Sequence, residues 1–193
     1  MKIIYILFFS FLISNEEVLS FNDKWESGYY NNSWNSNDKN VYSNDSLLIS
    51  ALNLIQENSL KEAITILKNI ISDSKSKLLQ LNAHYSLAQI YLSHMGQYEL
   101  AVDEFNQCLL YNSYENSEDN DSDIVKSFLE LKQKATFMIA YTYHNHIGNY
   151  SKAALFYQNF IMLYPDHELV PSVKFELKIL NDYEKVGDEL RRK

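Results

Sequence analysis

The chain has 193 residues, of which 46% are hydrophobic and 22% are charged, a composition that suits one globular domain with a buried core. Its formal charge of -8 at pH 7 disfavours electrostatic binding to nucleic acid phosphates or to anionic lipid. The low counts of glycine and proline, 4 and 2, favour long helices with few tight turns.

The first twenty residues predict a secretory signal peptide. Lys2 supplies a positive start, residues 3–13 are almost continuously apolar, and Val18 and Ser20 suit the −3 and −1 positions of a cleavage site. An apolar run of about eleven residues is short for a membrane span, so we expect a cleaved signal rather than a retained anchor. No cysteine lies directly after the run, which argues against a lipid anchor on an amino-terminal cysteine. The expected location is periplasmic or extracellular.

Residues 21–45 have a different composition, dominated by asparagine and serine without a helical or strand period. We interpret them as a disordered arm. Four closely spaced aromatic residues of the arm are unusual in such a segment: Trp25, Tyr29, Tyr30 and Trp34. The favoured interpretation is that they fold back onto an apolar groove of the same molecule; the alternative is a short motif that docks on a partner.

From residue 46 onward the apolar spacing is helical, and pairs of small residues recur along it. The pairs are Ala51 with Ala63, Ala88 with Ala101, and Ala140 with Ala153. The members are twelve positions apart in the first pair and thirteen in the other two. Each pair predicts the point where two antiparallel helices touch.

Other residue types also recur at matching positions in the three predicted hairpins. The predicted turns contain Asn58, Gly96 and Gly148, which tolerate a left-handed backbone. Positions after each turn hold Leu60, Tyr98 and Tyr150, and positions one helical turn beyond each second alanine hold Leu67, Phe105 and Tyr157. We predict a capping box from Ser59 to Glu62, a cap by Asn149, and a helix end before Pro165.

These positions resemble the tetratricopeptide repeat, which has a small residue in its first helix, a glycine turn followed by an aromatic residue, then an alanine and a large apolar residue. The resemblance covers about residues 46–181 and implies an all-α, right-handed α-solenoid of about three antiparallel helix pairs. The implied repeats are 46–75, 78–112 and 125–165, followed by a capping helix at 168–181 and a charged end at 182–193. Unlike the family pattern, the second and third turns contain one extra residue, Met95 and Ile147, and the first repeat has leucine in place of aromatics.

The segment YPDHELVPSVKFEL, residues 164–177, resembles the junction found in exported cell-envelope tetratricopeptide proteins that act in outer-membrane assembly or cell-division coordination. That likeness implies a bacterial protein that meets the membrane only indirectly, through an envelope complex. A eukaryotic secreted origin would instead make four asparagines possible glycosylation acceptors: Asn31, Asn44, Asn120 and Asn149.

Residues 112–123 are acidic and polar. Asp119, Asp121, Asp123 and Glu130 match positions one, three, five and twelve of a calcium loop. Ile124 stands where that loop needs glycine, so we favour a solvated loop that caps the next helix. A ligand- or calcium-binding module that uses residues 112–130 is the alternative function.

The sequence contains no phosphate-binding loop, nucleophile elbow, HExxH motif or paired CxxC, so we expect no catalytic residues, no cofactor and no enzyme activity. His144 and His146 are two apart on a predicted helix and therefore point to different faces, which disfavours a shared metal. Cys108 is the only cysteine, so no intramolecular disulfide can form. We expect a buried, inert thiol.

The resemblance implies a concave groove lined by the first helix of each pair, where an extended segment or a helix of a partner protein can bind. The residues predicted to line it are His84, Tyr85, Gln89, Ser93, Tyr141 and His144. The predicted function is a non-enzymatic, exported interaction scaffold of the cell envelope.

Overall fold

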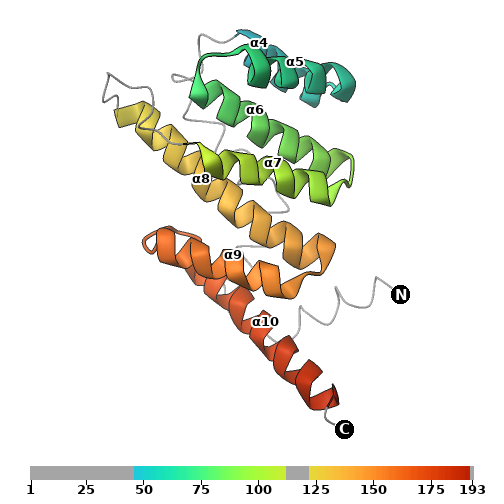
Figure 1. Cartoon of the computed structure of the whole chain (residues 1–193), viewed down its shortest axis with the longest axis vertical. Helices are drawn as coiled ribbons and strands as arrows, with labels where there is room; N and C mark the ends of the chain where they lie inside the picture. Colours follow the sequence, from blue (N-terminus) through green and yellow to red (C-terminus); the bar gives the residue numbers. More distant parts are fainter. Residues whose placement is uncertain (1–45, 112–121, 192–193) are drawn as a thin grey trace. The chain divides into compact units, whose positions relative to one another are not determined.

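The computed structural model describes residues 46–111 and 122–191, with side chains as far as Asp182. Every regular element in these residues is a helix (Figure 1). The predicted signal peptide, the aromatic arm and most of the acidic loop lie outside the described residues, so those three predictions stay untested.

Seven α-helices and two short π-helical turns make up the described residues. They are α4 (Ser46–Gln56), α5 (Leu60–Asp73), α6 (Lys77–Gln89), η1 (Ile90–His94), α7 (Tyr98–Leu110), α8 (Ser122–Thr142), η2 (Tyr143–Ile147), α9 (Tyr150–Leu163) and α10 (Val170–Arg191). Each α-helix packs against the next one in the chain, and α6 also contacts α4 and α8. The first helices of successive pairs therefore lie side by side, which confirms the predicted all-α, tetratricopeptide-like solenoid.

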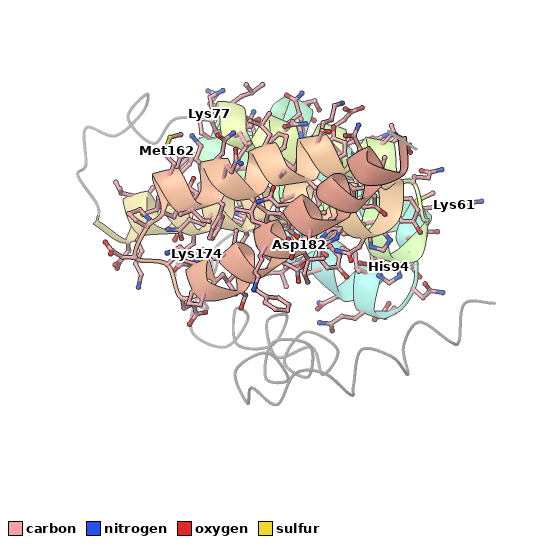
Figure 2. The ribbon with its side chains drawn as sticks, turned by 90° about the horizontal axis from the view of Figure 1, so that it is seen from below. Lys61, Lys77, His94, Met162, Lys174 and Asp182 are labelled. Atoms are coloured by element: carbon pink, nitrogen blue, oxygen red, sulfur yellow. The ribbon has the colours of Figure 1, made fainter. Side chains whose placement is uncertain are left out.

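The two ends of the hairpins can be followed in Figure 2. Lys61 and His94, which flank the turns within the first and second hairpins, lie at one end of the helices. Lys77, at the start of α6, and Met162, near the end of α9, lie at the other end. This arrangement is the one expected for antiparallel helices joined by short turns.

The paired alanines are all completely buried, as the predicted helix crossings require. All six, Ala51, Ala63, Ala88, Ala101, Ala140 and Ala153, are 0% exposed. A methyl side chain at each crossing lets the two backbones approach closely. Leu67, Phe105 and Tyr157, one helical turn further along the second helices, are also completely buried. The positions that recur in the sequence repeat are therefore the positions that are buried in the core.

The π-helical turns occur where the chain has its extra residue. In the first hairpin Asn58 has φ 59° and the next amide, of Ser59, donates to the carbonyl of Leu54 five residues back, at 2.8 Å. In the second hairpin Gly96 has φ 62°, but the amide of Gln97 reaches six residues back to Tyr91, also at 2.8 Å. The closing hydrogen bond spans one more residue, because the preceding turn is π-helical.

The third hairpin repeats this geometry. Gly148 has φ 74°, and the amide of Asn149 donates to the carbonyl of Tyr143 at 2.9 Å, again six residues back. Met95 and Ile147 thus correspond to a one-residue widening of the turn, so the alanine crossings keep their places despite the longer spacing. The backbone is left-handed at Gly96 and Gly148, which is why glycine is found at these two positions.

Helix ends agree with the prediction in some places and differ in others. Asn149 caps α9, with its side chain accepting from the amide of Lys152 at 3.1 Å, and α9 ends at Leu163, just before Pro165. The capping box predicted at Ser59 is wrong, because the Ser59 side chain makes no capping hydrogen bond. Ser76 instead caps α6 by accepting from the amide of Leu79.

One helix begins earlier than predicted, and another ends later. The sequence reading placed the start of the third pair at Val125, whereas α8 begins at Ser122. The capping helix was predicted to end at residue 181, whereas α10 continues to Arg191. The residues beyond 181 include Glu, Lys, Arg and Leu, which are strong helix formers, and no proline interrupts them.

Candidate functional site

The predicted groove residues come from α6 and η1 and from α8 and η2, the neighbouring first helices of the second and third pairs. On α6, the hydroxyl of Tyr85 accepts a hydrogen bond from Nε2 of Gln89 at 3.1 Å. The Tyr85 ring packs against the ring of Phe105 of α7 in an edge-to-face arrangement, with the ring centroids 5.4 Å apart. Burial raises the pKa of Tyr85, while the hydrogen bond from Gln89 lowers it. The result is a neutral hydroxyl and an amide held at fixed positions on one half-buried stretch of α6.

His84 lies next to Tyr85 in the chain but has different neighbours. Its side chain is buried, and its Nδ1 lies 2.7 Å from Oε2 of Glu104 on α7. Its ring also tilts against that of Tyr111, with centroids 5.8 Å apart. The structure therefore places the imidazole between the two helices of its own hairpin, and the carboxylate already occupies its Nδ1.

Ser93 and Tyr141 remain accessible from solvent. Ser93 lies in η1 and is exposed, while Tyr141 near the end of α8 is half-buried. The Tyr141 ring stacks on Phe137, with centroids 6.3 Å apart, and meets the edge of His146 at 5.6 Å. Tyr85, Gln89 and Tyr141 therefore stand on adjacent first helices in half-buried positions.

A polar cluster joins the third hairpin to α10. It consists of Tyr141, His144, Tyr157 and Glu176, and is called the His144 cluster below. Nδ1 of His144 lies 3.3 Å from Oε2 of Glu176, and the rings of Tyr150 and Tyr157 meet the His144 ring edge-on. Burial raises the pKa of Tyr157 well above its usual value, and the nearby Glu176 and Tyr141 raise it further. The Tyr157 hydroxyl is therefore neutral at physiological pH.

His146 contacts Tyr141 of this cluster but packs mainly toward α7. Its ring stacks on Tyr98, the first residue of α7, with centroids 4.6 Å apart and the planes 20° from parallel. Burial lowers the pKa of His146, which favours the neutral ring at pH 7. His144 faces α10 while His146 faces α7, so the two imidazoles diverge, as their two-residue spacing predicts.

Sequence reasoning missed the two carboxylates that His84 and His144 contact, Glu104 and Glu176. Glu104 lies three residues after the buried Ala101 and four before the buried Cys108. Glu176 has the same relation to Val173 and Leu180, which are both buried. A charged residue on the apolar face of a helix is unusual and generally has a partner, so this pattern could have identified both.

The described residues offer little for metal or thiol chemistry. No group of three histidine, cysteine, aspartate or glutamate side chains among them is placed to hold a metal ion. Cys108 is buried, as predicted, and its burial raises the pKa of the thiol, which disfavours the reactive thiolate.

The calcium-loop pattern does not fit the fold. Asp119 and Asp121 lie outside the described residues, but Asp123 and Glu130 both belong to α8. A calcium loop must bend around the ion between its fifth and eighth positions, whereas that stretch, residues 123–126, is helical here. The acidic residues from Asp123 onward are therefore part of a helix.

Among residues 46–111 and 122–191, no helix combines the length and the apolar character that crossing a membrane requires.

Comparison with known families identifies two segments. Residues 81–115 and residues 126–167 each match a family model described as tetratricopeptide repeat. These matches coincide with the second and third hairpins, which contain the glycine turns and the aromatic residues, and they support a tetratricopeptide repeat protein. No curated protein and no solved structure matches the chain.

Proposed function

We propose that this tetratricopeptide repeat protein is a non-enzymatic scaffold, exported to the cell envelope, that holds a segment of a partner protein against its first helices. Repeats of this kind suggest protein–protein interaction. The observation that carries the proposal is the contact of α6 with α8, which puts Tyr85, Gln89 and Tyr141 on adjacent helices. Together they offer aromatic surface, hydroxyls and an amide.

This surface suits a peptide rather than a nucleic acid. Tyrosine provides a large contact area with few rotatable bonds, and its hydroxyl can bond to a peptide backbone. Gln89 can donate and accept at once, as a backbone amide unit requires. The formal charge of -8 opposes binding to phosphates. The proposed occupant is an extended or helical protein segment with both apolar and hydrogen-bonding groups.

The binding surface can be tested with the double variant Gln89→Ala, Ser93→Ala. Partners are captured from an envelope fraction by the immobilised protein, identified by mass spectrometry, and their affinity is then measured in solution. We expect the double variant to bind a captured partner about tenfold more weakly, which corresponds to a loss of about 1.4 kcal/mol of binding free energy over the two side chains.

The matched control is Gln107→Ala, which removes an exposed glutamine from α7, a second helix of a pair. It should bind as the unchanged protein does, and thermal unfolding should show that both variants are folded at the temperature of the binding measurement. Equal affinities for all three proteins, or capture of nothing specific, would contradict the proposed surface.

Export rests on residues 1–20 and has its own test. In a bacterial host the protein should appear in the periplasmic or extracellular fraction, and mass spectrometry should find a mature amino terminus at Phe21. Replacing Leu7 and Phe8 with aspartate breaks the apolar run and should retain the full-length chain in the cytoplasm. A full-length, cytoplasmic product of the unchanged sequence would refute export and leave the binding proposal standing.

A further inference from the structure

The first described helix, α4, exposes large apolar side chains on a surface without charge. Ile49 and Leu52 are 43% and 42% exposed, and none of the residues from Ser46 to Gln56 is charged. Every other α-helix among the described residues contains at least one charged residue. An exposed apolar surface of this kind is typical of a binding site rather than of a freely solvated helix.

One side of α4 is polar where the later first helices are buried. Three positions, counted from the crossing alanines, are at most 1% exposed in both later helices: Ala83, Leu87 and Ile90 in the second hairpin, and Ala135, Ile139 and Thr142 in the third. At these positions α4 has Ser46, Ser50 and Asn53, which are all exposed. A polar outer side is typical of the terminal unit of a stacked-repeat protein. Leu52 lies about 100–160° from these three residues around the helix axis, so a further pair of helices stacked on α4 would not cover it.

Leu52 instead continues the row of residues proposed to bind a partner. Leu52, Gln89 and Tyr141 each follow the crossing alanine of their helix by one residue, and α6 contacts both α4 and α8. One helical turn further along, each of the three has an exposed polar residue. The six residues are called the neutral strip below: Leu52, Gln56, Gln89, Ser93, Tyr141 and Asn145. The neutral strip is thus apolar at α4, offers an amide and a hydroxyl at the second hairpin, and has an aromatic ring at α8.

The charge of the neutral strip limits what can bind to it. None of its six residues is charged, whereas the whole chain has a formal charge of -8. An acidic segment would be repelled by the chain as a whole. A basic segment would lose hydration on the strip without gaining a carboxylate partner there. An uncharged segment has neither disadvantage, and it can bury a large apolar side chain against Leu52 and Ile49.

We propose that Leu52 and Ile49 form an apolar subsite at one end of the binding surface, which selects an uncharged, extended partner segment with a large apolar side chain. This inference rests on the proposed scaffold function and specifies which segments the scaffold takes. The axes of packed helices are about 8–10 Å apart, and an extended chain advances about 3.3 Å per residue. The apolar side chain is therefore separated by about three residues from the peptide group that bonds to Gln89, and by about six from the residue that meets Tyr141.

Selection of displayed random peptides on the immobilised, full-length protein tests the subsite. The peptides are about twelve residues long, which in extended form is enough to cross three helices. Enriched peptides should be uncharged and share one large apolar residue. Leu52→Asn should weaken their binding in solution about tenfold, because the shared residue loses its apolar contact. Leu110→Asn, the matched control, should leave binding unchanged, since Leu110 is an exposed leucine on α7, a second helix.

A double-mutant cycle separates a direct contact from an effect on folding. Replacing the shared apolar residue of the peptide with asparagine should weaken binding to the unchanged protein about tenfold, and binding to Leu52→Asn hardly at all. Enriched peptides that bind Leu52→Asn normally but not the Gln89→Ala, Ser93→Ala variant would overturn the subsite and leave the scaffold function standing, whereas enrichment of no peptide would overturn both. Competition by a synthetic peptide of residues 21–45, or a dimer that Leu52→Asn converts to a monomer, would assign the neutral strip to the chain itself and overturn a partner there.

Discussion

The substitution Phe105→Ala is expected to lower the free energy of unfolding by about 3–5 kcal/mol. Phe105 is completely buried one helical turn after the Ala101 crossing, and the ring of Tyr85 packs against it edge-on. Truncation removes the buried ring and leaves a cavity between α6 and α7 that the surrounding side chains fill only in part. Urea unfolding followed by circular dichroism measures the loss.

Leu110→Ala is the matched control for Phe105→Ala. Leu110 belongs to the same helix but is 71% exposed, so its truncation should change the unfolding free energy by less than about 0.5 kcal/mol. Similar losses of unfolding free energy for the two variants would show that the recurring positions of the repeat do not define the core. A variant that shifts only part of the unfolding curve would instead show that the hairpins unfold separately, as stacked repeats can.

Ala140→Leu should destabilise the third hairpin by about 1–3 kcal/mol. Ala140 and Ala153 are both fully buried where α8 and α9 pack together, so a larger side chain must push the helices apart or take a strained rotamer. The same urea experiment measures the effect. Ala154→Leu, one position further along α9 and partly exposed, should be nearly neutral. If the Ala140→Leu protein were as stable as the unchanged protein, the contact between α8 and α9 would have space for a larger side chain, which would contradict a close helix crossing.

The parts of the fold that followed from the sequence are those where one local rule decides the outcome. An alanine in each helix at matching positions predicts a close crossing, and glycine or asparagine at the turn predicts a left-handed backbone at Asn58, Gly96 and Gly148. Asn149 satisfies a free amide at the start of α9. Each of these rests on the size or the hydrogen-bonding ability of one residue and needs no knowledge of distant neighbours.

The parts that did not follow depend on competition between neighbours. Ser59 has the right residue type for a cap, yet its side chain makes no capping hydrogen bond, while Ser76 does cap its helix. The partner of His84 could not be deduced from its own segment, because Glu104 belongs to another helix. The same holds for His144 and Glu176, whose contact depends on how α10 packs. The lining of a groove therefore remains the least predictable feature, since it depends on which polar side chains are already bonded within the core.

The widened turns at η1 and η2 have a consequence for how such a chain can vary. The first hairpin closes without the extra residue and the other two close with it, yet the alanine crossings are equally buried in all three. An extra residue in the turn therefore changes the turn alone and leaves the packing of the helices as it was. An insertion or deletion of one residue elsewhere in a helix would rotate every later side chain by about 100° around the axis. The turn is thus the position in each hairpin where a one-residue insertion or deletion can be tolerated during divergence without repacking the rest.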